Sequence, residues 1–201
     1  MSRQTIIQKH MKTIATLVLV LSAMVAGAVE KPRLEVYPVN EGKAIVALAN
    51  ERPARMVVSL SAGDGSLVYH SESKESQTGY RKLFDFSGLE DGRYVLSVKV
   101  NSTTVKRPIS IDGGALRVGD SEFRFDPYFS WSDDVLKISY LNFDGDPLRV
   151  TINGQESTVY EGSLGRNFSV MAGYDLSALD RGQYTVVVAG GDKQFVYTLN
   201  K

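Results

Sequence analysis

The fold is decided by the stretch Phe84-Asp85-Phe86-Ser87-Gly88-Leu89-Glu90-Asp91-Gly92-Arg93-Tyr94, because the chain uses it twice. It returns 90 residues later as Tyr174-Asp175-Leu176-Ser177-Ala178-Leu179-Asp180-Arg181-Gly182-Gln183-Tyr184, with Asp, Ser, Leu, Gly and Tyr in the same places. Upstream blocks keep nearly the same offset: Val58-Ser59-Leu60 matches Val150-Thr151-Ile152, Val68-Tyr69 matches Val159-Tyr160, and Val46-x-Leu48-x-Asn50 matches Ile138-x-Tyr140-x-Asn142. Separate blocks in register indicate two homologous modules of domain size, because solenoid repeats are much shorter.

Within both modules, apolar residues recur at every second position, which is the period of a strand. The expected strands of the first half are Leu34–Tyr37, Ala44–Ala49, Met56–Leu60, Leu67–Tyr69, Tyr94–Val100 and Val105–Ile111. Those of the second half are Phe123–Phe125, Val135–Leu141, Leu148–Ile152, Thr158–Tyr160, Asn167–Val170, Tyr184–Ala189 and Gln194–Leu199. Turn pairs such as Asp64-Gly65 and Asn153-Gly154 separate these runs, so the pattern predicts β-sandwiches.

The repeated stretch ends in Leu-x-x-Gly-x-Tyr, which has the form of the tyrosine corner of immunoglobulin-like sandwiches. The residues concerned are Leu89, Gly92 and Tyr94 in the first copy and Leu179, Gly182 and Tyr184 in the second. We expect the leucine to close the core and the glycine to permit a turn with positive φ. We expect the tyrosine to bury its ring and bond the preceding backbone. Asp85 and Asp175 are expected to form Asx turns, and the same corner in both copies favours this structural role over a catalytic Asp–Tyr pair.

The boundary between the modules is expected at Asp112-Gly113-Gly114. The predicted organisation is a signal peptide at 1–28, one sandwich module at 29–112 and a second at 113–201. The expected fold class is therefore all-β, with two tandem immunoglobulin/fibronectin III-like β-sandwich modules after a cleaved signal peptide.

The first 28 residues have the pattern of a secretory signal peptide. Their charged residues are Arg3, Lys9 and Lys12. The apolar run Ile14–Val25 ends in the small-x-small pattern Ala26-Gly27-Ala28. This run is shorter than the roughly 20 apolar residues that span a bilayer, so cleavage is favoured over a membrane anchor and no stable insertion is expected afterwards. Translation is compatible with a start at Met1 or at Met11.

Composition excludes several classes of function. The chain has no cysteine, which rules out disulfides, thiolate metal sites and cysteine nucleophiles. Its formal net charge is zero, so nucleic acid is not an expected partner. An exported chain without disulfides fits a bacterial envelope better than a eukaryotic secreted module. We therefore expect a secreted, periplasmic or outer-envelope protein of a Gram-negative bacterium.

The order of these motifs resembles the immunoglobulin-like modules of exported Bacteroidetes proteins, including the C-terminal sorting domains of the type IX (Por) secretion system. Val36-Tyr37-Pro38 is similar to the opening of such domains, Val58–Tyr69 to their hairpin, Phe84–Ile111 to their last three strands, and Phe195–Lys201 to their final strand. Two departures stand out. The Asn-Pro that commonly follows the opening is absent, and no cargo remains once both modules are assigned. The resemblance therefore implies the fold more than a sorting role.

The best candidate binding residues are aromatic. Phe123, Phe125, Tyr128, Phe129 and Trp131 lie within nine residues, and Trp131 is the only tryptophan. Exposed rings at Tyr128, Phe129 and Trp131 would form a platform for a protein or a glycan. The alternative is that Phe123 and Phe125 face the core while Tyr128, Phe129 or Trp131 fills the module junction.

Catalytic and metal sites have weaker support. His70 is the only histidine outside the first 28 residues, and its place beside the polar run Ser71–Thr78 indicates a solvated loop residue. The oxygen-rich segments Asp133/Asp134 and Asp144/Asp146 are open to calcium if their loops are neighbours, although turn chemistry explains both. No cofactor, metal site or catalytic residue is assigned.

These observations predict a non-catalytic binding, adhesion or scaffold protein that acts through sandwich surfaces on a protein or glycan at the cell surface. The alternative is a sorting or assembly module of type IX secretion. An enzyme inhibitor or a small hydrolase is the third possibility.

Overall fold

The computed structural model describes residues 31–40, 42–191 and 193–201. The chain divides between Phe125 and Asp126 into two compact units, the N-terminal unit and the C-terminal unit. The predicted signal peptide, its cleavage site and both possible starts lie outside the described residues. Within the described part of the chain, no helix is long and apolar enough to cross a membrane.

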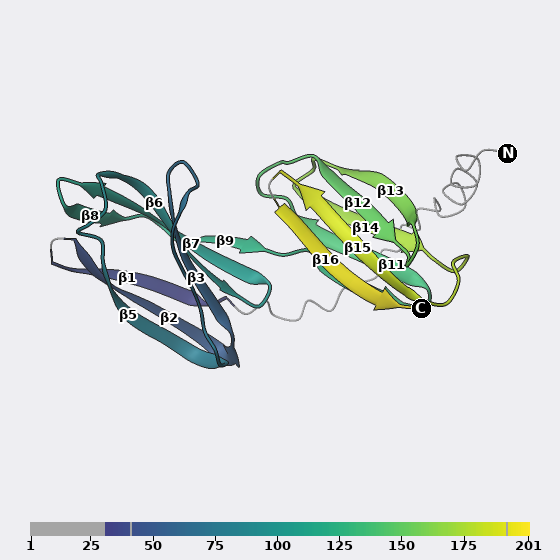
Figure 1. Ribbon diagram of the computed structural model, residues 1–201, viewed down its shortest axis with the longest axis horizontal. Helices are drawn as coiled ribbons and strands as arrows, with labels where there is room; N and C mark the ends of the chain where they lie inside the picture. The colour runs from purple at the N-terminus through teal and green to yellow at the C-terminus, as the bar shows by residue number, and fades with distance from the viewer. Residues whose placement is uncertain (1–30, 41, 192) are drawn as a thin grey trace. The chain divides into compact units, whose positions relative to one another are not determined.

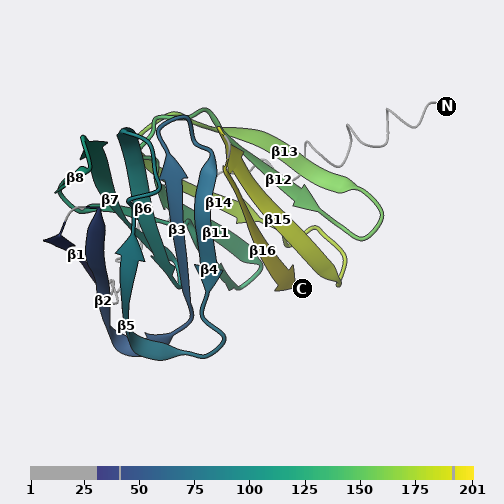
Figure 2. The same ribbon diagram turned by 60° about the vertical axis from the view of Figure 1, so that its left-hand side comes forward.

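The N-terminal unit is a sandwich of two antiparallel sheets (Figure 1, Figure 2). One sheet has the order β1 (Arg33–Asn40), β2 (Lys43–Ala54), β5 (Gln77–Asp85). The other has the order β4 (Leu67–Glu72), β3 (Met56–Ala62), β6 (Gly92–Val100), β7 (Thr103–Asp112), β8 (Ala115–Val118), and β9 (Glu122–Phe125) also pairs with β7. Alternate residues point inward from both sheets, so the core lies between them.

The C-terminal unit repeats this topology (Figure 1). Its first sheet has the order β10 (Tyr128–Ser132), β11 (Val135–Leu141), β14 (Ser169–Asp175). Its second has the order β13 (Thr158–Gly165), β12 (Leu148–Asn153), β15 (Gln183–Gly190), β16 (Lys193–Asn200). Strands β1 to β7 thus correspond one by one to β10 to β16. The described part of the chain is all-β, with two tandem immunoglobulin/fibronectin III-like β-sandwiches, as the sequence predicts.

Each unit has its own core. Buried residues of the N-terminal unit include Leu34, Val46, Leu48, Leu60, Phe86, Leu96 and Val98. Those of the C-terminal unit include Leu136, Ile138, Val150, Ile152, Leu176, Val186 and Val188. Fully burying one such side chain stabilises a fold by roughly 1.5–3 kcal/mol. The hydrophobic contribution to the stability of each unit therefore comes from that unit's own residues.

Matched side chains of the two units make matched contacts. The rings of Tyr69 and Phe84 lie 5.1 Å apart, and so do those of Tyr160 and Tyr174, their counterparts in the repeat. These pairs join the two sheets at the same edge of each sandwich. The repeat seen in the sequence is thus a repeat of tertiary contacts.

The repeated asparagines also have equivalent roles. Both are buried: Asn50 lies within β2, where the pairing with β5 becomes irregular, and Asn142 directly follows β11. The Nδ2 of Asn50 donates to the carbonyl of Arg52 at 2.7 Å, and the Nδ2 of Asn142 donates to the carbonyl of Asp146 at 2.9 Å. Asn50 therefore holds the irregular last part of β2, and Asn142 holds the loop that follows β11.

The expected module boundary after Asp112 is wrong. Gly113 and Gly114 have φ of 57° and 79° and form the turn that pairs Asp112 with Ala115. This turn returns the chain to its own sheet, where β8 and β9 both hydrogen-bond to β7. The Gly-Gly pair is therefore a hairpin turn, and the boundary lies after Phe125.

Three strands were not expected from the sequence. They are β5, which begins in the polar run Ser71–Thr78, β8, which follows the Gly-Gly pair, and β10, inside the aromatic cluster. All three lie at the edge of a sheet, so much of each faces solvent and the apolar alternation is weak. In β5, only Phe84 is fully buried. The strand expected to end at Val170 in fact continues, as β14, to Asp175.

Candidate functional site

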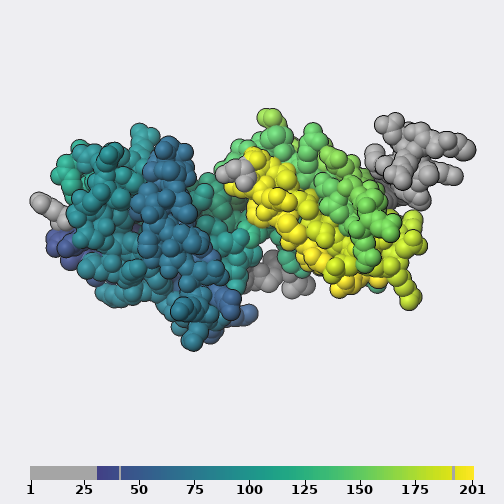
Figure 3. Space-filling model, in the orientation of Figure 1, coloured from purple at the N-terminus to yellow at the C-terminus, as the bar shows by residue number. Residues whose placement is uncertain are grey.

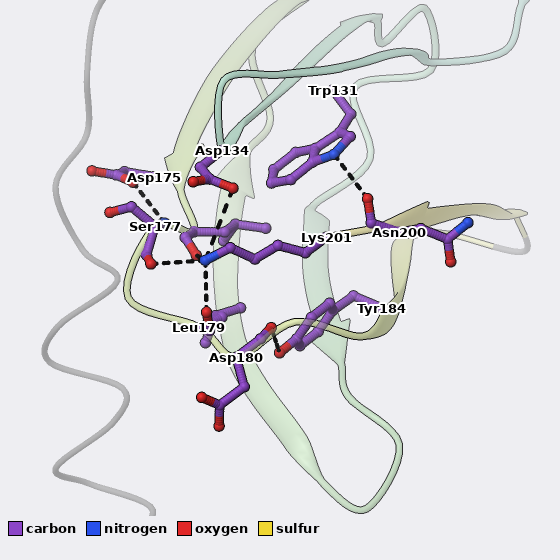
Figure 4. A network of polar contacts seen from close by, with 10 residues as sticks. Trp131, Asp134, Asp175, Ser177, Leu179, Asp180, Tyr184, Asn200 and Lys201 are labelled. Carbon is purple, nitrogen blue, oxygen red and sulfur yellow. Dashed lines mark hydrogen bonds and ion pairs between the residues drawn. The ribbon is translucent and has the colours of Figure 1, made fainter.

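The two tyrosine corners have the same geometry. The hydroxyl of Tyr94 donates to the carbonyl of Glu90 at 2.8 Å, and the hydroxyl of Tyr184 donates to the carbonyl of Asp180 at 2.8 Å (Figure 4). Both rings are buried. These are the hydrogen bonds that the sequence analysis expects, and they fix the loop before β6 or β15 to the start of that strand.

The glycines of the corners differ from expectation. Neither Gly92 nor Gly182 is among the residues with positive φ. A Cβ added to Gly92 would meet only an ordinary contact at 3.9 Å, and one added to Gly182 would meet nothing within 4 Å. The expected positive φ is therefore wrong: Gly92 is already the first residue of β6, and Gly182 directly precedes β15.

We predict that Tyr94→Phe and Tyr184→Phe each lower the free energy of unfolding by about 1–1.5 kcal/mol. Each change removes one hydroxyl and leaves a backbone carbonyl of the corner without its donor, while the ring still fills the core. Urea unfolding of the single variants measures the loss. The control is Tyr37→Phe, which alters a tyrosine that is 52% exposed and leaves stability unchanged. If all three variants lost the same free energy of unfolding, the corner hydrogen bonds would not be the cause of the loss.

The aspartates of the repeated stretch form Asx turns. The Oδ1 of Asp85 accepts the N–H of Ser87 at 3.0 Å and also its hydroxyl. The Oδ1 of Asp175 accepts the N–H of Ser177 at 2.9 Å. The serine hydroxyl is the main cause that lowers the pKa of Asp85, and the serine N–H is the main cause that lowers the pKa of Asp175.

These lowered pKa values predict a pH dependence of stability. Because each folded pKa lies below its unfolded value, the contribution is complete above about pH 4 and is lost as the pH falls through the folded pKa. Asparagine can still accept the serine bonds without titrating. We therefore expect the double variant Asp85→Asn/Asp175→Asn to lose less stability than the parent between pH 5 and pH 2. The measurement is thermal unfolding across that range. The control, Glu75→Gln/Glu156→Gln, removes two exposed carboxylates elsewhere. If the control lost equally little stability over this pH range, the two Asx-turn aspartates would not be the cause.

Lys201 completes the corner of the C-terminal unit (Figure 4). Its ammonium donates to the carbonyls of Leu176, Ser177 and Leu179 at 2.8, 2.7 and 2.6 Å. Asp134 lies 3.9 Å away on the other side. The side chain of Lys201 is only 10% exposed, so these oxygens replace most of its hydration. The equivalent position in the N-terminal unit is the buried Ile111, which is opposite Gly92 as Lys201 is opposite Gly182.

The aromatic cluster is divided between the two units. Phe123 and Phe125 belong to β9, and Phe123 packs against the core of the N-terminal unit. Phe129 and Trp131 belong to β10 and pack against the core of the C-terminal unit. Tyr128 alone among the three candidate binding residues is strongly exposed, at 61%.

Phe129 and Trp131 join the two sheets of the C-terminal unit. The ring of Phe129 stacks on Tyr197 of β16 with the centroids 5.0 Å apart. The indole Nε1 of Trp131 donates to the carbonyl of Asn200 at 3.2 Å (Figure 4). The expected platform of Tyr128, Phe129 and Trp131 is therefore wrong as a set, because alternation along β10 turns Phe129 and Trp131 toward the core.

Tyr128 belongs to a different exposed surface. On the outer face of the sheet β10-β11-β14, Tyr128 pairs with Ser139, which pairs with Met171. At the end of this sheet the rings of Phe143 and Phe168 meet edge to face, 5.3 Å apart. We call the exposed residues Tyr128, Leu141, Phe143, Phe168 and Met171 the apolar face.

The sequence contained a partial signal for the apolar face. In the run that holds Val170 and Met171, one of two adjacent apolar residues must point outward if the other is in the core. The alternation predicts a strand that ends at Val170, one residue before Met171. That Met171 and Tyr128 flank the same residue follows only from the register of three strands.

The N-terminal unit has a smaller counterpart on the same side of its own sandwich. Tyr37, Ile45 and Leu83 form one row across β1, β2 and β5. Tyr37 and Leu83 are exposed. In both units, then, large apolar side chains lie on the outer face of the three-stranded sheet, where contact with a partner would remove them from water.

The titratable candidates do not converge. His70 lies within β4, opposite Ser59, and not in a loop as expected, although it is exposed. Asp133 and Asp134 form the turn before β11, whereas Asp144 and Asp146 follow that strand. Seven strand residues separate the two pairs by roughly 20 Å, so the idea of neighbouring calcium loops is wrong. Among the described residues, no group of three or more His, Asp or Glu side chains is arranged to hold a metal ion.

Comparison with known proteins finds distant structural similarities alone. No family model matches the chain, and no curated protein matches its sequence. A segment of two fibronectin type III domains from chicken tenascin is 13% identical, with a TM-score of 0.30, over 86% of this chain and 100% of that one.

Two further structures are similarly distant. The BSP domain of a biofilm-associated protein is 12% identical, with a TM-score of 0.29, over 84% of this chain and 29% of that one. A β-glucuronidase from an uncultured Clostridium species is 10% identical, with a TM-score of 0.27, over 84% of this chain and 34% of that one. At these identities and scores, neither similarity informs the function of this chain.

Proposed function

We propose that the chain is an exported, non-catalytic binding or scaffold protein of a Gram-negative cell envelope, and that it contacts a protein or a glycan through the apolar face. The observation that carries the proposal is the exposure of five large apolar side chains on and beside one sheet. Tyr128 and Met171 are each 61% exposed, and Phe168 is 57% exposed. Patches of this kind mark interaction sites in soluble proteins.

The chemistry of the apolar face suits contact rather than catalysis. The strands β10, β11 and β14 hold Tyr128, Leu141 and Met171 on one sheet, and Phe143 and Phe168 lie beside its end. Tyr128 has a ring for stacking and a hydroxyl that can donate to a polar group, the combination enriched at binding hot spots. Met171 has a flexible thioether that adapts to irregular partners.

Photo-crosslinking in the producing cell tests the proposal. A photoreactive amino acid replaces Ser139, which lies between Tyr128 and Met171 on the apolar face. The control position is Thr151 on β12, on the outer face of the other sheet. We expect an adduct of defined mass from position 139, none from 151, and loss of the adduct when Met171→Glu is added. Mass spectrometry then identifies the partner as protein or glycan. Equal labelling at both positions, or none at 139, would refute the assignment.

Export is a separate part of the proposal, and it rests on the pattern of residues 1–28. Fusion of these residues to a reporter that is active only outside the cytoplasm is expected to give activity, and replacing Leu17 and Leu19 with arginine is expected to abolish it.

The alternative assignment, a type IX sorting module in a Bacteroidetes cell, makes a different prediction. In that case residues 126–201 fused to a periplasmic reporter would carry it to the cell surface.

A further inference from the structure

β16 is an edge strand with an unused row of backbone groups. It is bonded to β15 on one side, where Lys201 and Gly182 exchange both of their hydrogen bonds. In an antiparallel ladder, alternate residues point their N–H and C=O away from the neighbouring strand. In β16 these residues are Gln194, Val196 and Thr198. Within the described chain, none of these three has a partner for its backbone N–H or C=O on that side.

The N-terminal unit closes the equivalent edge with its own chain. Its strand β7 corresponds to β16, yet β8 and β9 cover the outer side of β7. Thr104 pairs there with Arg124, and Lys106 pairs with Glu122. Pro108, the counterpart of Thr198, has no N–H to leave unpaired, and its carbonyl accepts the N–H of Gly119 at 2.8 Å. The fold thus accommodates an added strand on this edge, and one of its two units already has one.

In the C-terminal unit, only one end of the edge is occupied. The indole N–H of Trp131 donates a hydrogen bond to the carbonyl of Asn200 at 3.2 Å. The open part therefore comprises the three residues Gln194, Val196 and Thr198. β16, drawn in yellow, lies at the surface of its unit in the space-filling view (Figure 3).

The open part lacks the features that usually protect an edge. Natural edges are blunted by charges, prolines or bulges. The stretch Gln194-Phe195-Val196-Tyr197-Thr198 has no charge and no proline, and its pairing with β15 has no register shift. By contrast, the pairing of the opposite edge strand, β13, has register shifts, and that strand carries Glu161, which pairs with Arg149. Val196 is 59% exposed, an apolar side chain at the centre of an open edge.

The same stretch is symmetric in residue type. Read from either end, it is polar, aromatic, valine, aromatic, polar. In an antiparallel pairing centred on Val196, each aromatic residue is therefore opposite an aromatic residue, and each polar residue is opposite a polar one. Aromatic and β-branched cross-strand pairs stabilise sheets, and no like charges oppose each other. A second copy of the same strand matches this pattern at every position.

We propose that β16 pairs with β16 of a second copy of this chain, about a two-fold axis through Val196. Val196 then lies opposite the partner's Val196, Gln194 opposite the partner's Thr198, and Phe195 opposite the partner's Tyr197. Each of the three outward-facing pairs exchanges two hydrogen bonds, so the contact uses every free group of the open part. The two four-stranded sheets become one continuous sheet, and the interface is isologous.

Sedimentation velocity over a concentration series of the purified protein tests the dimer. Val196→Lys places two ammonium groups opposite each other at the axis and is expected to raise the dissociation constant at least about tenfold, because like charges directly opposite are destabilising. Thr198→Pro removes an outward N–H at the position where the N-terminal unit itself has Pro108, so the fold tolerates it, and we expect a similar loss. The control Thr151→Lys adds the same charge to the outer face of the same sheet and leaves the dimer intact.

A cysteine variant tests the register. The chain has no cysteine, so Val196→Cys introduces the only thiol. Residues facing each other in such a pair have Cα atoms about 5.5 Å apart, within the range of a disulfide. We expect rapid, complete formation of a disulfide dimer from this variant, and little from Thr151→Cys. Monomer at all concentrations, or a dimer that resists both Val196→Lys and Thr198→Pro, would overturn the proposal. Met171→Glu is expected to leave the dimer intact, which separates it from binding at the apolar face.

Discussion

Phe86→Ala is expected to lower the free energy of unfolding of the N-terminal unit by about 3–5 kcal/mol and to leave the C-terminal unit unchanged. Phe86 is 2% exposed in the core of its unit, where its ring stacks on Phe84. Removal of the ring forfeits its burial and leaves a cavity between the sheets. The two cores have no residue in common, so the loss is confined to one unit.

Trp131 makes this prediction measurable unit by unit, because the only tryptophan lies in the C-terminal unit. In urea, the Trp131 fluorescence transition of Phe86→Ala is expected to match that of the parent, while circular dichroism shows an earlier transition. The matched variant is Leu176→Ala. Leu176 is the counterpart of Phe86, since both donate their N–H to the first hairpin of their unit, at Asp134 and Gly42 respectively. It is expected to shift the Trp131 transition by about 2–5 kcal/mol. If each variant shifted both signals equally, the cores would not be independent.

Lys201→Met is expected to cost the C-terminal unit about 1.5–3 kcal/mol, the range for hydrogen bonds to a charged group. Methionine keeps most of the apolar stem but removes the ammonium that three carbonyls and Asp134 surround. These carbonyls belong to the loop that the corner of Tyr184 also holds. Without the ammonium, part of the loop must bind water or open.

Trp131 fluorescence in urea also measures this effect, because Trp131 bonds Asn200, the residue before Lys201. The control is Arg149→Met, which removes an equally charged side chain that is 73% exposed and paired with Glu161. Exposed pairs contribute about 0–1 kcal/mol, so the control is expected to change little. Equal losses in the two variants would mean that the carbonyls around Lys201 provide no more than a surface ion pair.

The features that could be predicted are those that depend on near neighbours in the chain. Tyr94 bonds a carbonyl four residues before it, and Asp85 bonds an N–H two residues after it. Such contacts leave a recognisable spacing, and a spacing that occurs twice is stronger still. The module boundary could not be predicted in this way. Gly113-Gly114 indicates a turn, but the local sequence does not show whether the strand after the turn stays in the same sheet.

The sequence by itself determined that the chain is all-β and duplicated, because alternation and repeated corner motifs are local properties of the order of residues. Only the tertiary structure decided which side chains form surfaces. Met171 joins Tyr128 across Ser139 through the register of three strands, and Trp131 packs against the core of its unit and bonds Asn200. The open edge of β16 likewise follows only from the tertiary structure, by comparison with β7, whose equivalent edge is covered by β8 and β9. Surfaces and edges depend on pairings between distant segments, and these pairings leave no periodic signal in a single strand.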